Sequence, residues 1–140
     1  EEGIVPGGGA ALVHVADSIG DLGRTGDEAT GVGIVRSACA APLFWIAANG
    51  GAEGAVVVGR VREQEWGHGY DTESGTYHDL VSAGIIDPVK VTRSAVINAA
   101  SIARMVLTTE SAIVDKPVEK HADGGHGHGH GHGHSHRPVF

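Results

Sequence analysis

The sequence is poor in cysteine and in aromatic residues, and each shortage narrows the class of protein. One cysteine, Cys39, stands among 140 residues, which excludes an internal disulfide framework and favours a reducing compartment such as the cytoplasm. Because Cys39 lies in an apolar run, we interpret it as a buried structural thiol. Aromatic residues make up 4% of a chain that is 41% hydrophobic, so the core must come from Val, Ile, Leu and Ala. Such small side chains favour closely packed helices.

Basic residues are also scarce. Lys and Arg total 10 against 17 acidic residues, a formal net charge of -7. Phosphate backbones are bound by clustered Lys and Arg, so no nucleic-acid partner is expected. We find no signal peptide and no apolar stretch that we expect to span a bilayer, so no membrane association is expected either. Because the first residue is Glu1 and not Met, we expect a piece of a longer protein.

Apolar periodicity predicts helices over the first half of the chain. A helix is expected over about residues 8–22, behind three consecutive glycines. The next begins at a capping box formed by Thr25 and Glu28 and ends at residues 49–51, with a break near Ala41 because Pro42 cannot continue the helix. Periodicity alone does not separate helix from strand over residues 52–62, where we favour helix.

The second half of the chain mixes strand and helix signals. Aromatic and β-branched residues around a polar loop predict a short hairpin over residues 66–77. Residues 79–83 can form one helical turn before Gly84. The pair Asp87–Pro88 predicts a helix start with Asp87 as the cap, and the helix should run to about Thr108. A short strand is expected over residues 111–115.

The last twenty residues have a separate composition of glycine and histidine. No core can be built from them, so the tail is expected to be disordered when free. It is either a flexible extension or a binding site for nickel, copper or zinc, because neutral imidazole is a good ligand for these ions. Acid should protonate the rings and release the metal. The candidate ligands are His126, His128, His130, His132, His134 and His136.

Three ordered segments resemble group I (GroEL-type) chaperonins. The first is a glutamate pair followed by three glycines and an Ala-Leu step, over residues 1–12; the second is Gly69-Tyr70-Asp71-Thr72; the third is the Gly-Ile-x-Asp-Pro-x-Lys-Val-x-Arg-x-Ala block over residues 84–95. Their order and spacing match the family pattern. The resemblance covers about residues 1–116.

The resemblance implies a mainly α fold. Residues 1–116 would form the C-terminal share of a multihelical equatorial domain with a small β-hairpin and a C-terminal strand, and residues 117–140 a flexible tail. The complete protein would be an ATP-dependent folding machine that uses magnesium and potassium. Its partners would be identical subunits in a double ring, a co-chaperonin and unfolded client proteins. The family's phosphate loop and hydrolytic aspartate lie outside this chain, so no catalytic residue is assigned and the chain alone should not hydrolyse ATP.

The same resemblance assigns nucleotide contacts. Gly8 matches the family's nucleotide-contacting glycine, although a tight turn would also explain it; exposed N–H groups at a helix start suit a phosphate. Asp71, Thr72 and Glu73 match the positions that contact the base, but the family commonly has Asn followed by two alanines. Ionised Asp only accepts hydrogen bonds, so base binding would change. Asp87 matches a ribose contact, and its alternative role is the helix cap.

Three hypotheses follow. In the first, the chain is part of a chaperonin subunit. In the second, it is a metal-handling protein that acts through its tail, and deletion of residues 121–140 separates the two. In the third, it is an inactive piece whose uncovered apolar face promotes association.

Overall fold

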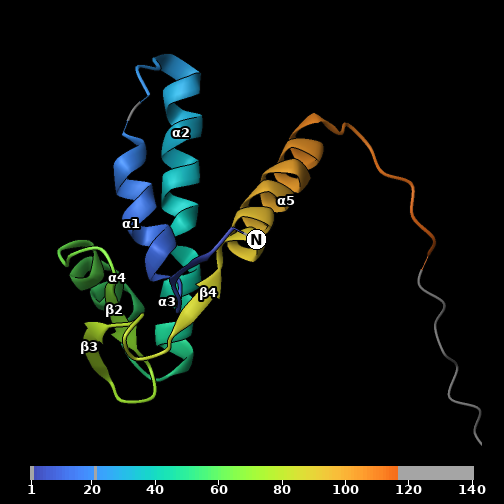
Figure 1. The fold of residues 1–140 in the computed structure, drawn as a ribbon. Helices are drawn as coiled ribbons and strands as arrows, with labels where there is room; N and C mark the ends of the chain where they lie inside the picture. Colours follow the sequence, from blue (N-terminus) through green and yellow to red (C-terminus); the bar gives the residue numbers. More distant parts are fainter. Residues whose placement is uncertain (1, 21, 117–140) are drawn as a thin grey trace, which may run out of the picture. The chain divides into compact units, whose positions relative to one another are not determined.

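The computed structural model describes residues 2–20 and 22–116 and divides the chain into two units, Glu1–Thr108 and Thr109–Phe140. The first unit is mainly helical, as predicted (Figure 1). In chain order its elements are β1 (Ile4–Pro6), α1 (Ala10–Ile19), α2 (Gly26–Cys39), α3 (Ala41–Asn49), α4 (Gly54–Arg62), β2 (His68–Asp71), β3 (Thr76–Asp79), β4 (Ile86–Pro88) and α5 (Val89–Thr108).

The core joins α1, α3, α4 and the β2–β3 hairpin, which gather at one end of the α1–α2 pair (Figure 1). Its members are mostly small aliphatic residues, as the composition predicted: Ala10, Val13, Leu43, Ala47, Val57, Val58, Val61, Tyr70 and Leu80. Three of the four valines of α4, Val57, Val58 and Val61, lie on one buried face of the helix. Their spacing resolves residues 52–62 as a helix.

The helical half of the chain follows the prediction, including the start of α2 at Gly26 with Thr25 in the N-cap position. The break between α2 and α3 lies at Ala40, and Pro42 occupies the first turn of α3, where a missing N–H is tolerated. The predicted capping box is wrong. The Thr25 side chain makes no cap hydrogen bond, and the Glu28 carboxylate pairs instead with Arg24 at 3.2 Å.

The expectation that no apolar stretch could span a bilayer is wrong for residues 26–49. The stretch Gly26–Asn49, which is α2 and α3 together, is long and apolar enough to cross a membrane by length and composition. One such stretch is weak evidence for a membrane span. Within it, Leu43 and Ala47 of α3 are fully buried in the protein core, whereas most of α2 is exposed.

Two antiparallel strand pairs complete the unit. The hairpin of β2 and β3 is the one predicted, with Tyr70 opposite Tyr77. The second pair, β1 with β4, was not predicted, and it places Asp87 opposite Val5. The predicted helix is confirmed with its end at Thr108, but it begins at Val89, whose N–H donates to the Gly3 carbonyl at 3.1 Å. The predicted cap is wrong, because Asp87 lies in strand β4. Residues 79–84 form a turn closed by a hydrogen bond from Ala83 N–H to the Asp79 carbonyl, in keeping with one helical turn.

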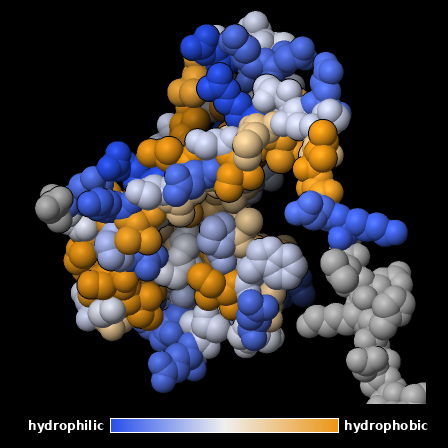
Figure 2. Space-filling model, turned by 90° about the vertical axis from the view of Figure 1, so that its right-hand side faces the viewer, coloured by the Kyte–Doolittle hydropathy of each residue, from blue (hydrophilic) through white to orange (hydrophobic). Residues whose placement is uncertain are grey.

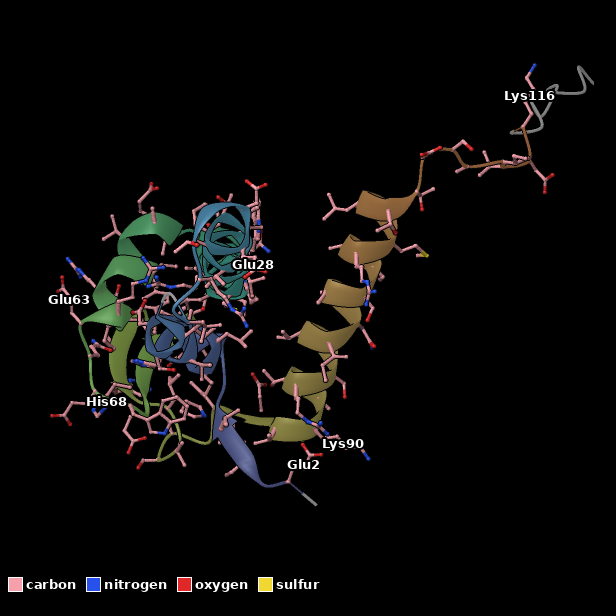
Figure 3. The ribbon with its side chains drawn as sticks, turned by 90° about the horizontal axis from the view of Figure 1, so that it is seen from above. Glu2, Glu28, Glu63, His68, Lys90 and Lys116 are labelled. Carbon is pink, nitrogen blue, oxygen red and sulfur yellow. The ribbon has the colours of Figure 1, made fainter. Side chains whose placement is uncertain are left out.

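Helix α5 differs from the other helices. None of its 20 residues is buried by the described part of the chain. It is tied to the first residues by Arg93, whose Nε donates to Glu2 Oε2 at 3.1 Å, and Figure 3 shows Glu2 beside the start of this helix near Lys90.

The strand predicted over residues 111–115 is wrong for the described structure. Residues 109–116 have no regular secondary structure, and the Ile113 and Val114 side chains are exposed. A strand needs a hydrogen-bonded neighbour, and the described residues supply none for this segment.

Candidate functional site

The glycine turn before α1 is held by close backbone contacts on both sides. The N–H of Gly7 donates to the Ile85 carbonyl at 2.9 Å, and a Cβ at Gly7 would lie 3.1 Å from backbone atoms of Ile85 and Ile86. A Cβ at Gly9 would lie 2.6 Å from the backbone nitrogen of Leu43 in α3. Gly9 also has a φ of 82°, which L side chains rarely adopt. The turn is therefore fixed between β4 and α3.

Gly8, the middle residue, has more room. Its φ is 62°, and the nearest atom to a Cβ there would be the Tyr70 carbonyl oxygen at 3.8 Å. Its backbone therefore keeps open space beside it. The predicted helix over residues 8–22 is shorter, Ala10–Ile19, because Gly8 and Gly9 both have left-handed φ values.

The start of α1 carries no acidic side chain, and the first helical N–H, that of Ala10, donates to the Gly7 carbonyl at 3.1 Å. The N-cap of α1, Gly9, has no side chain to accept hydrogen bonds. The first N–H groups of a helix have no partner within the helix, and the helix dipole adds partial positive charge there. Phosphate groups bind well to such positions.

The hairpin packs directly on this turn. A Cβ at Gly69 would lie 2.8 Å from Ala10 Cβ and 2.5 Å from Leu80 Cδ1, so β2 approaches the first residue of α1 as closely as a glycine permits. The Tyr70 carbonyl next to Gly8 belongs to the residue before Asp71. The hairpin tip and the glycine turn are thus neighbours.

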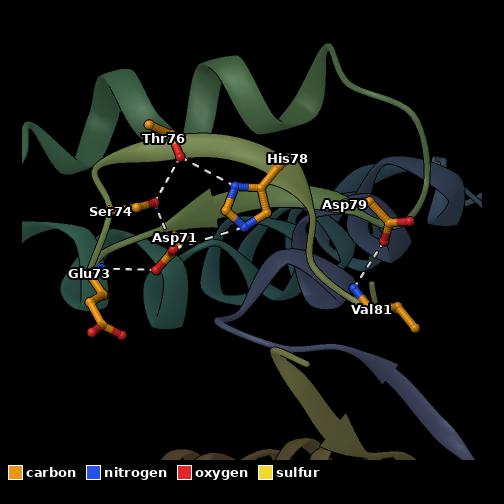
Figure 4. Close-up of polar contacts among 7 residues, drawn as sticks. All are labelled: Asp71, Glu73, Ser74, Thr76, His78, Asp79 and Val81. Atoms are coloured by element: carbon orange, nitrogen blue, oxygen red, sulfur yellow. Dashed lines mark hydrogen bonds and ion pairs between the residues drawn. The ribbon is translucent and has the colours of Figure 1, made fainter. Parts of the chain in front are cut away.

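Asp71 has an occupied carboxylate (Figure 4). Oδ1 accepts from the Glu73 N–H at 2.9 Å and Oδ2 accepts from Ser74 Oγ at 2.6 Å. These bonds, Ser74 first and the Glu73 N–H second, hold the pKa of the Asp71 carboxyl below its usual value, and His78 adds to the effect. The group is therefore an ionised acceptor whose oxygens already serve the hairpin.

Thr72 and Glu73 lie at the tip in different ways. The Thr72 methyl group lies over the backbone of Gly50, just after α3, where a Cβ would overlap it. The Glu73 side chain points away from the other labelled residues in Figure 4. Of these two side chains, only the Glu73 carboxylate extends from the tip.

Asp87 lies in β4, half-buried, directly after the two residues that contact Gly7. Its side chain makes no hydrogen bond to the described residues, so the cap role is not observed and the carboxylate is available. The residues next to the predicted positions meet at the glycine turn: the Tyr70 carbonyl lies beside Gly8, and Ile85 and Ile86 lie against Gly7.

The predicted metal ligands of the tail fall on residues that the structure does not describe. His126, His128, His130, His132, His134 and His136 lie outside the described residues. Within residues 2–20 and 22–116, no group of three His, Cys, Asp or Glu side chains is arranged to hold a metal ion.

Ser74 and His78 were missed by the sequence argument. They complete a chain of contacts around Asp71 in which Ser74 Oγ lies 2.8 Å from Thr76 Oγ1, and Thr76 Oγ1 lies 3.3 Å from His78 Nδ1. The only signal for them is the Asp-x-x-Ser spacing that begins at Asp71.

Comparisons with known proteins agree with the motifs. The model of the TCP-1/cpn60 chaperonin family matches residues 1–117. Chaperonin GroEL 1 of Mycobacterium ulcerans (strain Agy99) is 59% identical over 129 residues, which is 90% of this chain and 24% of the relative. The open-state monomer of a group II chaperonin from Methanococcoides burtonii shares the fold with a TM-score of 0.71 at 21% identity, over 76% of this chain and 28% of that chain. The chain thus spans about a quarter of these relatives.

Proposed function

This chain belongs to the TCP-1/cpn60 chaperonin family, and we propose that it is the C-terminal share of the ATP-binding equatorial domain of a GroEL-type subunit. Residues 1–116 supply one side of the nucleotide pocket. The complete subunit would bind ATP with magnesium and potassium, form a homo-oligomeric double ring, and fold client proteins with a co-chaperonin in the cytoplasm. The parts that complete the pocket belong to the rest of the subunit.

The observation that carries the proposal is the meeting of three distant segments at one glycine turn. Gly8 offers open backbone at a helix start that lacks acidic side chains. The hairpin tip lies beside it, and Asp87 follows the strand residues that contact Gly7. We assign the Gly8 backbone to a phosphate group, residues 71–73 to the base and Asp87 to the ribose hydroxyls, which a carboxylate can accept.

A second observation supports the view that the chain is part of a larger unit. A cavity of about 380 Å³ is lined by apolar residues of α1, α2, α3 and the small-residue face of α5, including Ala95, Ala99 and Ala103. Figure 2, which looks onto the side of the molecule that carries α5, shows hydrophobic areas at the surface. The rest of the subunit would cover this face.

The site assignment is tested with Asp87→Ala in the complete subunit. If the carboxylate binds ribose, ATP affinity should fall by about tenfold, the effect of losing a hydrogen bond to a charged group. Asp115→Ala is the control, because Asp115 is exposed and lies in the other unit. Isothermal titration calorimetry with ATP provides the measurement. Equal affinity of the Asp87 variant and the wild type would remove Asp87 from the site.

The proposal that the hydrolytic residues lie outside this chain is tested with the 140-residue chain alone. The isolated chain should bind ATP weakly and should not hydrolyse it. The complete subunit should bind ATP and hydrolyse it. Robust ATPase activity of the isolated chain would contradict the proposal that the hydrolytic residues lie elsewhere. Binding of nickel, copper or zinc by the tail stays a prediction from the sequence.

A further inference from the structure

The hairpin carries the same turn twice. Asp71 and Ser74 are three residues apart, as are Asp79 and Ser82. In each turn, Oδ1 of the aspartate accepts from the N–H two residues later, at 2.9 Å from Glu73 and 3.0 Å from Val81. Oδ2 accepts from the serine hydroxyl, at 2.6 Å and 2.7 Å. We call these the Asp71 turn (residues 71–74) and the Asp79 turn (residues 79–82); parts of both appear in Figure 4.

The two turns differ in their surroundings. The Asp71 turn lies at the hairpin tip beside the glycine turn. It is extended by Thr76 and by His78, whose Nε2 lies 3.9 Å from Asp71 Oδ2, so its contacts return to the same carboxylate. The Asp79 turn follows β3 and contains the buried core residue Leu80. One geometry therefore occurs once at the proposed site and once beside the core.

The contacts of Asp71 give its carboxylate a structural role within the hairpin. An ionised carboxylate accepts hydrogen bonds and donates none. Each oxygen of Asp71 already accepts one bond, from the Glu73 N–H and from the Ser74 hydroxyl, and keeps a second lone pair. Replacing either bond would release the backbone of the tip, which presents Thr72 and Glu73.

We propose that Asp71 and Ser74 are positioning residues: their mutual hydrogen bond and the Asp71–Glu73 bond fix the tip so that residues 72 and 73 meet the nucleotide base. This inference rests on the proposed function, because it presupposes that the tip contacts a nucleotide. It gives the Asp71 side chain a positioning role in addition to the base contact assigned above.

The test compares Asp71→Ala, Ser74→Ala and the double variant in the complete subunit, with ATP affinity measured by calorimetry. Each single change should weaken binding by about three- to tenfold, the range for one lost hydrogen bond. The double variant should be no weaker than the weaker single variant, because the two residues act through one bond. Ser74→Thr keeps the hydroxyl and should restore binding. Ser82→Ala removes the matching hydroxyl of the Asp79 turn and should leave ATP affinity unchanged.

Hydrogen exchange of the Glu73 amide, measured without nucleotide, provides a second readout. Exchange should accelerate in Ser74→Ala and return to the wild-type rate in Ser74→Thr. If Ser74→Ala binds ATP like the wild type while Asp71→Ala does not, Asp71 contacts the nucleotide directly and the inference is wrong. Faster exchange with unchanged affinity would also overturn it. If the wild-type subunit does not bind ATP, the proposed function fails and this inference fails with it.

Discussion

The glycine-turn region and helix α5 are built on opposite principles. Around the glycine turn, α1, α3, α4 and the hairpin bury Leu43 and Leu80 completely. Along α5, no residue is buried by the described chain, and Leu107 is 85% exposed. A helix of 20 residues gains most of its stability from packing of its apolar face. The first region therefore supplies its own packing, whereas the described chain supplies little packing for α5.

The largest expected effect comes from breaking the packing of the glycine turn. Gly9→Ala places a Cβ 2.6 Å from Leu43 backbone and also imposes a strained φ. We expect the variant to lose about 3 kcal/mol or more, because strain and overpacking add. Gly3→Ala is the matched control: its φ is also 82°, and none of the described residues has an atom within 4 Å of the new Cβ. It should cost only the φ strain, about 1 kcal/mol.

Native-state hydrogen exchange of the α1 amides in the complete subunit reports the local free energy of opening for both glycine variants. A Gly9→Ala cost no larger than that of Gly3→Ala would mean that the turn is not held by α3.

The next effect compares one substitution in the two regions. Leu80→Ala empties a fully buried position and should destabilise the protein by about 2–5 kcal/mol. Leu107→Ala in the isolated chain should change stability by less than about 0.5 kcal/mol, as at other exposed positions. Urea unfolding of the dilute 140-residue chain measures both. A large cost at Leu107 in this chain would contradict the view that α5 is unsupported.

A smaller effect is expected from acid at the hairpin tip. The pKa of Asp71 is lowered in the folded protein, mainly by the Ser74 hydroxyl and next by the Glu73 N–H, with His78 facing it from β3. Its contribution to stability is therefore complete above the pKa of the unfolded chain, about 4, and is lost as the pH falls through the lower folded value. Between pH 5 and 8 the part that comes from the Ser74 and Glu73 hydrogen bonds should stay constant.

Amide chemical shifts of Glu73 followed from pH 7 to pH 2 check the sign. The shift should begin to move below about pH 4 in the wild type, where the carboxylate is protonated. Asp71→Asn should remove this transition. A transition centred above pH 5 would show that folding raises the pKa of Asp71 instead of lowering it.

The sequence anticipated the local structure better than the long-range pairing. Pro42 predicted the break between α2 and α3, and the aromatic pattern predicted the hairpin, because both signals lie within a few residues. The pairing of β4 with β1 joins positions about 80 residues apart, which a local pattern does not report. The strand predicted at residues 111–115 was wrong for the same reason. Its local residue pattern does not indicate whether a neighbouring strand is present in the described chain.

The candidate site shows the same limit. Family motifs identified Gly8, residues 71–73 and Asp87, and in the structure the Tyr70 carbonyl lies beside Gly8 while Asp87 pairs with Val5 in the strand before the glycine turn. The motifs did not indicate that the Asp71 oxygens are occupied, because Ser74 and Glu73 become partners only through the shape of the turn. Nor did they show that Gly9 and Gly69 are required by close contacts with Leu43 and with Ala10 and Leu80.

The smallest effect concerns the side-chain link between the first residues and α5. Arg93 donates two hydrogen bonds to the Glu2 carboxylate, but both side chains are partly exposed. Exposed ion pairs contribute about 0–1 kcal/mol, and salt screens them. Arg93→Gln should therefore accelerate exchange of the first α5 amides slightly at low salt and not at high salt. The Arg24–Glu28 pair within α2 serves as the control, since Arg24→Gln should leave α5 unchanged. If Arg93→Gln releases α5 as strongly as Leu80→Ala disrupts the core, α5 is held by its own contacts and the contrast between the two regions disappears.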